Sequence, residues 1–447
     1  MPLKRYLFCI LILFAAANAR AQDSTLINGP VRWNLQQCID YAKKNNIDIN
    51  SLRLARKTAD QELLLARASR QPDLNATASQ FVTHRNTGSN GLNGNYGGSG
   101  WGYDGNYSAS SSITIFNGGY INNNISQKNL QVQSANLNII QQENDITLQV
   151  TQAYLAVLLD KENIISDTSI ANTSRAQVGL EQKRFNVGSV ARKDLIQLQA
   201  QQAGDEYNVV QAKNAERGDL LTLKQLLLLP TEADFDIVRP DTIIANASQI
   251  TPLGQAIDTA LKNRPEVKNS QMSVDIAQYN VKKAKAGYLP TLTGSASVSS
   301  GYTNGQGAFG SQLNNNFFQQ LGVTLNIPIF TKRVVKTQVE EAKINVESAQ
   351  LNLKNTKITL SQSVERYYIN LQNAKSQYDA AAVQFNFSQE SYRIANEQLK
   401  VGVANVVDFL LQKTQYIQAQ QAFIQAKYNV LLSLKIYDFY RGVPITL

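Results

Sequence analysis

Apolar side chains recur with the spacing of a coiled-coil helix over two long stretches of the chain. In the second stretch they follow at alternating intervals of three and four residues: Val339, Ala342, Val346, Ala349, Leu353, Thr356 and Leu360. Residues 332–399 contain no Pro or Gly, and residues 121–185 contain only one Gly, Gly179. At 1.5 Å per residue each segment would make a helix of roughly 100 Å, far beyond the usual helix of about 11–12 residues. We therefore predict two very long helices that pack in coiled coils.

Each long stretch ends at a turn signal and is followed by a second helical stretch. Val187-Gly188 and Val401-Gly402 stand at the two ends, and Gly is the residue expected directly after a helix. Return helices are predicted over residues 194–229 and 407–436. The pattern thus predicts two helical hairpins, whose tips lie at residues 187–194 and 401–408.

Four segments show a period of two instead, in which apolar and polar residues alternate. They lie at residues 74–83, 107–116, 290–302 and 317–327. In the last segment Leu321, Val323 and Leu325 share one face, whereas Phe81 falls on the polar face of the first. Strands of about ten residues match a tilted membrane-spanning strand. A soluble four-stranded sheet packed on the helices is the alternative.

Polar segments rich in Gly and Asn join these strands in pairs. We predict loops over residues 84–106 and 303–316. Aromatic side chains gather near the loop ends, where a membrane protein would carry an aromatic girdle: Trp101, Tyr103, Tyr107, Tyr302, Phe317 and Phe318. A helix over residues 35–69, ended by Pro72, is predicted before the first strand pair.

The chain contains the same unit twice. When Leu35 is aligned with Leu253, the segments Leu35–Ser79 and Leu253–Ser297 share 14 identical positions. Beyond the first strand pair the offset shortens by four, so that Val187-Gly188 meets Val401-Gly402 and Asp194 meets Asp408. A repeat unit of this size exceeds those of solenoids and indicates duplication of a whole structural unit.

The duplication gives the predicted organisation of the chain. The segments are a signal peptide (1–21), a first repeat (22–229, with strands at about 72–116), a connector (230–252), a second repeat (253–436, with strands at about 290–330) and a C-terminal tail (437–447). We expect the connector to lie outside the main helical body, at an equatorial position, that is, around the middle of its length.

The N-terminus has the pattern of an export signal. Lys4 and Arg5 precede an apolar run from Tyr6 to Ala17, and Ala19-Arg20-Ala21 fits a cleavage site. The alternative, an uncleaved anchor, is disfavoured because the run is shorter than the ~20 residues of a spanning helix. Cleavage would leave Cys38 as the only cysteine, so that no intramolecular disulfide could form.

Composition excludes several classes of function. The net charge is +9, and cleavage of the signal peptide would remove three basic residues and leave a mild +6; no long basic run occurs, which argues against nucleic acid as a partner. Only 17% of residues are charged, whereas 43 Asn and 43 Gln supply much of the polarity. One His and two Cys exclude His-rich or Cys-rich metal sites and most His-based catalysis. We expect no catalytic, metal or cofactor site.

Four strands from one chain cannot close a barrel, and a sheet edge exposed to lipid is costly. Three copies would supply twelve strands, an even number in the range of outer-membrane barrels. The same trimer would gather six long helical hairpins into a tube. We therefore expect a homotrimer if the strands lie in a membrane.

Over essentially all of its mature length the chain resembles the TolC-type outer-membrane efflux proteins. The resemblance rests on the openings at Leu35 and Leu253, each of the form Leu-x-x-x-Ile-x-x-Ala-x-x-Asn, and on Ile327-Pro328-Ile329-Phe330 after the fourth strand. Its most specific part is Val-Gly-x-x-x-x-x-Asp at both tips, Val187 to Asp194 and Val401 to Asp408.

The resemblance implies a fold of mixed α and β type: four strands of a 12-stranded trimeric barrel in the outer membrane, and a long antiparallel coiled-coil tunnel in the periplasm. It implies a passive exit duct for a tripartite efflux or type I secretion system. The partners would be a periplasmic adaptor (membrane fusion) protein, a proton-driven or ATP-driven inner-membrane transporter, and outer-membrane lipid. Such a duct is not an enzyme and uses no cofactor.

The resemblance also implies a periplasmic gate at the tips. Asp408 and Asp194 would form acidic rings in a trimer, which favour cations. The alternative is a simple helix N-terminal charge. Some family members carry a second Asp where this chain has Leu411, and an Arg latch where it has Ala404. Leu411 could supply a hydrophobic constriction instead.

The turn residues are the adaptor contacts that the resemblance implies. They are Val187, Gly188, Ser189 and Val190 at the first tip, and Val401, Gly402, Val403 and Ala404 at the second. The alternative is that each Gly merely permits the turn. Two competing functions are a periplasmic coiled-coil scaffold without a pore and an exported enzyme, although the chain contains no common catalytic motif.

Overall fold

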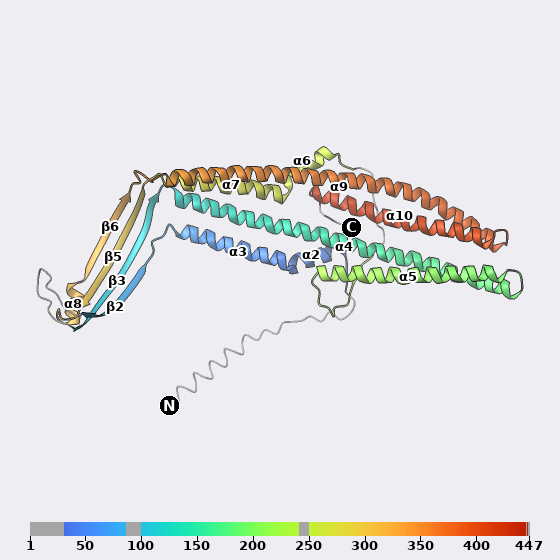
Figure 1. The fold of residues 1–447 in the computed structure, drawn as a ribbon, viewed down its shortest axis with the longest axis horizontal. Coiled ribbons are helices and arrows are strands. Elements are labelled where there is room, and N and C mark those ends of the chain that lie inside the picture. Colours follow the sequence, from blue (N-terminus) through green and yellow to red (C-terminus); the bar gives the residue numbers. More distant parts are fainter. Residues whose placement is uncertain (1–30, 86–99, 241–249, 444, 446–447) are drawn as a thin grey trace, which may run out of the picture. The chain divides into compact units, whose positions relative to one another are not determined.

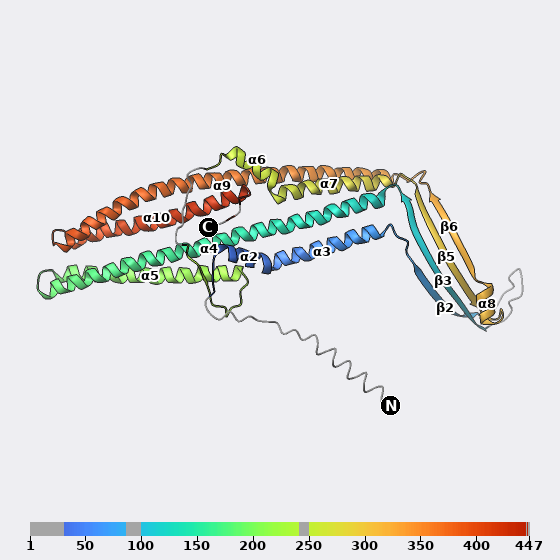
Figure 2. The same cartoon turned by 180° about the vertical axis from the view of Figure 1, so that it is seen from behind.

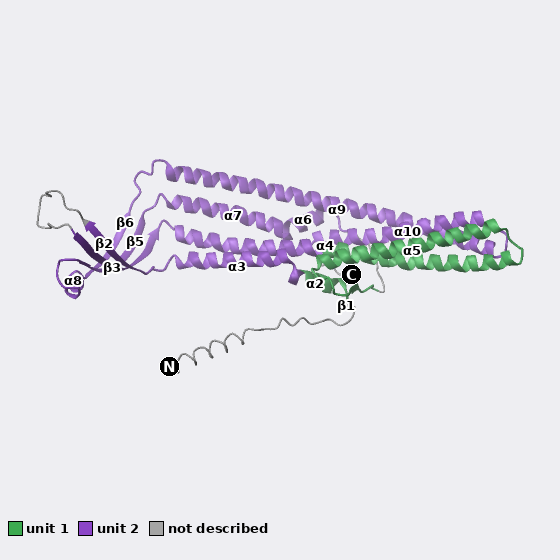
Figure 3. Ribbon diagram, turned by 60° about the horizontal axis from the view of Figure 1, so that its bottom comes forward, with its two compact units in different colours: residues 1–42, 150–243, 446–447 green, residues 43–149, 244–445 purple. Residues whose placement is uncertain are grey.

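A computed structural model describes residues 31–85, 100–240, 250–443 and 445. The predicted signal peptide lies outside the described residues. The chain forms two compact units (Figure 3): unit 1 comprises residues 1–42 and 150–243 with 446–447, and unit 2 comprises residues 43–149 and 244–445. The boundaries of the two units differ from those of the two sequence repeats, because each unit contains a part of the first repeat.

The elements alternate between long helices and short groups of strands (Figures 1 and 2). The first repeat contains β1 (Val31–Trp33), α2 (Leu35–Asn45), α3 (Ile47–Ala68), β2 (Asn75–Arg85), β3 (Gly100–Asn117), α4 (Tyr120–Asn186) and α5 (Arg192–Leu226). The connector contains β4 (Phe235–Ile237). The second repeat contains α6 (Leu253–Asn263), α7 (Pro265–Ala286), β5 (Thr291–Thr303), α8 (Phe309–Asn315), β6 (Phe318–Asn326), α9 (Val334–Lys400) and α10 (Val406–Tyr440).

The two long helices confirm the heptad interpretation. Helices α4 and α9 are each 67 residues long, which corresponds to roughly 100 Å. Their return helices α5 and α10 are each 35 residues long. Helix α10 continues to Tyr440, so the predicted start of the C-terminal tail at residue 437 is wrong. The added turn is held by Tyr437, which is fully buried and donates a hydrogen bond from its hydroxyl to Thr251 O at 2.8 Å.

The prediction of one helix over residues 35–69 is wrong, because each repeat has a break there. Asn46 separates α2 from α3, and its side-chain Oδ1 accepts a hydrogen bond from Ile49 N at 3.0 Å. In the second repeat Pro265 stands at the first turn of α7, where a missing N–H costs nothing. A new helix therefore begins at each of the two breaks.

In unit 2 the four long strands form one antiparallel sheet in the order β2-β3-β5-β6. The second strand begins at Gly100 rather than near Tyr107, so the first predicted loop is too long. The second predicted loop contains helix α8. Its Gln312 is buried, and its side-chain amide bonds to Thr303 N, Thr303 O and Gly307 O.

Each strand of this sheet is joined to one helix at the same end (Figure 1). Side-chain amides join α4 of the first repeat to α7 of the second. Gln127 donates to Asn280 at 2.6 Å, and Lys283 donates to both Asn124 and Gln127 at 2.8 Å. The high Asn and Gln content thus serves helix–helix contacts. An apolar cluster of unit 2 joins α6, α7, α9 and α10: Ala256, Ala260, Val267, Leu360, Val364, Leu371, Ala374, Val430 and Tyr437.

The connector contains a strand that the sequence analysis did not predict. In unit 1, β4 pairs with β1 in parallel, with Trp33 opposite Ile237. No helix within the described residues has the length and apolar character that a membrane crossing requires.

Candidate functional site

The register of the sheet separates its side chains into two faces. Leu292, Gly294, Ala296 and Val298 of β5 lie opposite Leu325, Val323, Leu321 and Gln319 of β6, and this face is mainly apolar. The other face carries hydroxyls, amides and glycines, for example Ser108, Ser110, Ser112, Ser295, Ser297, Ser299, Thr324 and Asn326. We call it the hydroxyl face. Such a division is what a wall between lipid and water needs.

The apolar face is uncovered within the described chain. Leu321 is 88% exposed and Val323 70% exposed. No described helix therefore packs over this part of the sheet, which removes the alternative of a soluble sheet buried on the helices. Strands β2 and β6 are the two edges, and each has one strand neighbour among the described residues.

Aromatic side chains lie near both ends of the apolar face. Trp101, Tyr103 and Tyr107 lie toward the loop end of β3, and Phe116 lies toward its helix end. Tyr107 and Phe116 are roughly 30 Å apart along a strand with about 3.3 Å per residue. At a tilt of about 40° this spacing is close to the apolar band of about 25 Å in outer-membrane barrels. Phe318 is an exception, because its register opposite Ser299 places it on the hydroxyl face.

The tip of the first hairpin, in unit 1, is a tight helical stop. Gly188 has a φ of +76°, and its N–H donates to Phe185 O at 2.9 Å. Ser189 N donates to Arg184 O at 2.9 Å, which completes a Schellman motif. Val187 and Ser189 are exposed, Val190 is half-buried, and Asp194 lies half-buried in the first turn of α5.

The tip of the second hairpin, in unit 2, repeats this geometry. Gly402 has a φ of +79° and donates to Leu399 O, while Val403 N donates to Gln398 O at 2.9 Å. Val401 and Val403 are 74% and 77% exposed. The end of the helix requires only the glycine, so the two valines are not needed for the turn. They form an exposed apolar surface at this end of the unit.

The acidic residue of the second tip is held in place by its own helix cap. Asn405 caps α10: its Oδ1 accepts from Asp408 N at 2.8 Å, and its Nδ2 donates to Asp408 Oδ2 at 2.6 Å. Asp408 and Leu411 are both exposed, and Ala404 is half-buried in the turn. The structure thus brings Asp408, Leu411 and the second turn together. Asp194 belongs to unit 1.

The second hairpin is held together by a ladder of aromatic rings that the sequence analysis missed. Heptad-spaced rings on α9 alternate with heptad-spaced rings on α10: Tyr378, Phe385 and Tyr392 with Phe409, Tyr416 and Phe423. The centroids of Phe385 and Phe423 are 5.1 Å apart, and those of Tyr392 and Tyr416 are 4.9 Å apart. The signal was present as aromatics at heptad spacing in both helices.

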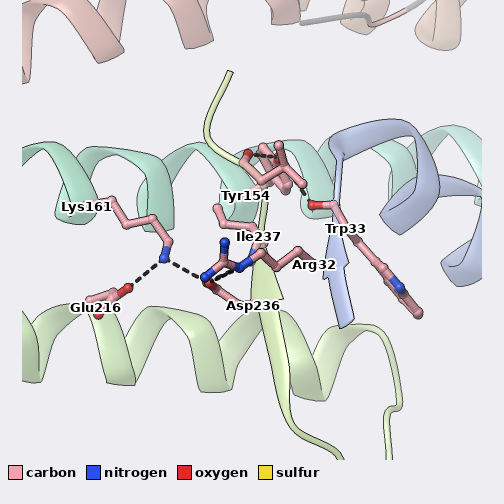
Figure 4. Close-up of polar contacts among 8 residues, drawn as sticks. Arg32, Trp33, Tyr154, Lys161, Glu216, Asp236 and Ile237 are labelled. Carbon is pink, nitrogen blue, oxygen red and sulfur yellow. Dashed lines mark hydrogen bonds and ion pairs between the residues drawn. The ribbon is translucent and has the colours of Figure 1, made fainter. Parts of the chain in front are cut away.

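In unit 1 an ionic latch fastens the connector strand to the first hairpin (Figure 4). Lys161 on α4 contacts Glu216 on α5 at 2.9 Å and Asp236 on β4 at 2.7 Å. Arg32 on β1 also approaches Asp236, at 3.4 Å. Tyr154 is 1% exposed, and its hydroxyl donates to Val238 O at 2.6 Å. The connector therefore bridges the two helices of this hairpin.

Next to this latch two carboxyl groups face each other. Burial, the negative charge of Asp219 and a hydrogen bond with it raise the pKa of Asp160 to about 6. Glu216 adds a further negative charge. The folded state therefore binds a proton at Asp160 more tightly than the unfolded chain, whose carboxyl titrates near 3.8. The charged carboxylate of Asp160 therefore destabilises the folded state, and this destabilisation is fully present above about pH 7. It disappears as the pH falls from about 6 to about 4.

Asp160→Asn is expected to stabilise the helical part by about 1 kcal/mol at pH 7.5, after allowance for solvent screening of a partly exposed group. The gain should shrink as the pH is lowered toward 4, because the wild-type carboxyl is then protonated. Urea unfolding of both proteins at several pH values measures the difference. Asp40→Asn, at an exposed carboxylate on α2, is the control and should show no such trend. A gain independent of pH would contradict the assignment.

Within the described residues no group of His, Cys, Asp or Glu side chains is arranged to hold a metal ion. Cys38 is buried on α2, and burial raises the pKa of its thiol to about 12. The described residues present a two-faced sheet, two long hairpins and their tips. These define a subunit of a membrane channel with a helical extension.

Comparison with known proteins agrees with this class. The chain matches the outer membrane efflux protein family over residues 38–227 and 256–435. It is 24% identical to the outer membrane efflux protein BepC of Brucella suis, over 88% of this chain and 81% of that protein. It is also 24% identical to the outer membrane protein TolC of Escherichia coli, over 90% of this chain and 80% of that protein.

Among solved structures, the fold is similar to that of CusC, whose crystal structures concern transmembrane channel formation. The TM-score is 0.78 at 16% sequence identity, over 94% of this chain and 96% of that one. The chain therefore belongs to the outer membrane efflux protein family, as an export channel of the outer membrane. The predicted resemblance, the mixed α and β channel fold and the outer-membrane location are confirmed.

Proposed function

We propose that this chain forms a homotrimeric exit duct, through which an efflux or type I secretion system passes its cargo across the outer membrane. The observation that supports this most directly is the uncovered sheet with two free edges. Three such sheets joined edge to edge would give twelve strands with the apolar face toward lipid and the hydroxyl face toward water. Closure would satisfy the backbone groups of β2 and β6.

The internal repeat supplies the register of the contact between copies. The alignment of Leu35 with Leu253 makes β2 equivalent to β5, and the alignment of Val187 with Val401 makes β3 equivalent to β6.

The pairing of Phe81 with Asp104 recurs as Ser299 with Phe318, so the two strand pairs share one register. If the contact between copies repeats the β3–β5 contact, in which Ser110 lies opposite Ser297, then Thr324 of one copy lies opposite Ser79 of the next.

This register is testable by cross-linking. Thr324→Cys with Ser79→Cys, on a Cys38→Ala background, is expected to give covalent trimers on mild oxidation of the membrane-inserted protein. The control pairs Thr324→Cys with Gln80→Cys, whose side chains lie on opposite faces of the sheet. Denaturing gel electrophoresis reads the result. Equal cross-linking in both variants, or none in either, would count against this closure.

The two helical tips would form the periplasmic mouth of the duct. In a trimer Asp408 and Asp194 each occur three times, and Leu411 lies three residues after Asp408 on the exposed surface of α10. The tight stops at Val187, Gly188, Ser189 and Val190 and at Val401, Gly402, Val403 and Ala404 would meet a periplasmic adaptor protein. The exposed valines give that contact an apolar component. An inner-membrane transporter, driven by protons or ATP, would complete the system.

The duct itself would be a passive conduit that changes no covalent bond. The side chains of the hydroxyl face interact with water and with passing solutes, and the energy would come from the transporter. The hypothesis of a soluble periplasmic scaffold is disfavoured, because it leaves Leu321 and Val323 exposed to water.

A further inference from the structure

One cross-strand pair stands out on the hydroxyl face. Among the strand residues whose side chains the structure describes, the only large apolar groups on this face are Phe81 and Phe318, and the only charged group is Asp104. Phe81 is 58% exposed and lies directly opposite Asp104 in the register of β2 and β3. Directly opposed residues of an antiparallel pair have Cβ atoms about 5 Å apart.

We propose that Phe81 and Asp104 form a contact site for amphiphilic organic cations inside the bore of the channel. The inference rests on the proposed function, because the hydroxyl face lines the bore only in the closed trimer. A cation near an aromatic ring is attracted by the ring's negative face within about 6 Å. The adjacent carboxylate attracts the same charge, and the ring offers its surface to the apolar body of the solute.

Position and symmetry strengthen this contact. The pair lies toward the loop end of the sheet, beyond the Ser- and Thr-rich part of the face. Threefold symmetry would place three copies of the pair at one height around the bore, as a ring that every solute passes. An inorganic cation would gain only the attraction of its charge, whereas a cation with an apolar body would also gain the contact of that body with the ring.

The second repeat provides a matched control. The equivalent pair there is Ser299 with Phe318, which keeps an aromatic ring but lacks the carboxylate. Phe318 is 50% exposed on the same face, so that it resembles Phe81 in setting. Removing Phe318 therefore tests whether any ring on this face suffices, or whether the ring must lie beside Asp104.

A structural role for Phe81 makes a different prediction. The register inferred for the contact between copies places Phe81 opposite Gly322 of the neighbouring copy, where its ring could cover the missing side chain. In that case Phe81→Ala would loosen the trimer, and block by an organic cation would not depend on it.

The experiment measures block of the reconstituted full-length channel by tetraphenylphosphonium, added in turn to each chamber of a planar bilayer. Phe81→Ala and Asp104→Asn are each expected to raise the half-blocking concentration about fivefold or more. Phe318→Ala should change it less than twofold, and potassium conductance should stay near the wild-type value. The thermal dissociation of each trimer on gels is recorded in parallel.

Each outcome decides the proposal. Unchanged block in Phe81→Ala, with a lower dissociation temperature, would assign Phe81 to the contact between copies and overturn the site. Equal effects of Phe81→Ala and Phe318→Ala, with unchanged block in Asp104→Asn, would show that the carboxylate is irrelevant and also overturn it. If the wild-type protein conducts but tetraphenylphosphonium does not block it, only this inference fails. A wild-type protein that forms no channel would remove the proposed function as well.

Discussion

Replacing Phe409 by alanine is expected to destabilise the α9–α10 hairpin by about 3–5 kcal/mol, the usual cost of truncating a buried aromatic side chain. Phe409 is fully buried and contacts Tyr392, the last ring of the ladder on α9. It also lies directly after Asp408, so the loss should appear first at the tip. Urea unfolding gives the magnitude, and amide hydrogen exchange gives the location.

The matched control for this variant is Val407→Ala. Val407 lies two residues earlier on the same turn but is 54% exposed, so its truncation should cost less than about 0.5 kcal/mol. If the two variants were equally stable, the ladder would not hold the hairpin together. If Phe409→Ala lost stability while amide hydrogen exchange at the tip stayed slow, the prediction that the hairpin opens first at its tip would be wrong.

Removing the charge of Asp408 is expected to raise the concentration of a trivalent cation such as hexamminecobalt that half-blocks the channel, by about tenfold or more. In the proposed trimer the substitution removes three carboxylates from one ring. Asp408→Asn is preferable to alanine because Asn keeps the size of the side chain, and the bond from the backbone N–H of residue 408 to Asn405 can remain. Potassium should also lose part of its preference over chloride.

The control for this variant is Asp379→Asn. Asp379 is an exposed carboxylate of the same hairpin but lies roughly 30 Å along the helix from Lys400, the end of α9. Its removal should leave block unchanged, because exposed charges beyond a Debye length of about 8–10 Å are screened. Equal block of the wild type and Asp408→Asn would contradict the proposal that Asp408 belongs to the gate. Asp408 would then serve only as a negative charge at a helix N-terminus.

The long elements could be predicted from the sequence because their signals extend over many residues. The heptads of α9 and the absence of Pro and Gly locate a 67-residue helix to within two residues at each end. The alternation around Leu321, Val323 and Leu325 assigns the faces of β6 correctly. Both tips follow from Gly188 and Gly402, which take the left-handed conformation that a helix stop requires.

The features that could not be predicted depend on few residues or on contacts distant in sequence. Strand β4 is too short for a periodic pattern, and nearly the whole first repeat separates it from its partner β1. Lys161 shows nothing in sequence that links it to Asp236, which lies beyond the return helix α5. The break at Asn46 depends on one side chain that caps a helix. The start of β3 at Gly100 is hidden by glycines, which composition assigns to a loop.

The candidate sites divide in the same way. The identities of Asp408, Asp194 and the tip residues came from repeated motifs, and the structure adds the cap by Asn405 that fixes the geometry of Asp408. The pairing of Phe81 with Asp104 needs the register of two strands joined by a long loop, which the sequence alone does not supply. Phe81 was visible beforehand only as an imperfection of the alternation.

The central claim is that the chain forms a trimeric channel through its exposed sheet. Planar-bilayer conductance of detergent-purified protein, on a sample whose mass is determined by light scattering, tests it most directly. A particle of three chains that opens discrete, cation-preferring channels is expected. A stable monomer that stays soluble without detergent and gives no conductance would contradict it.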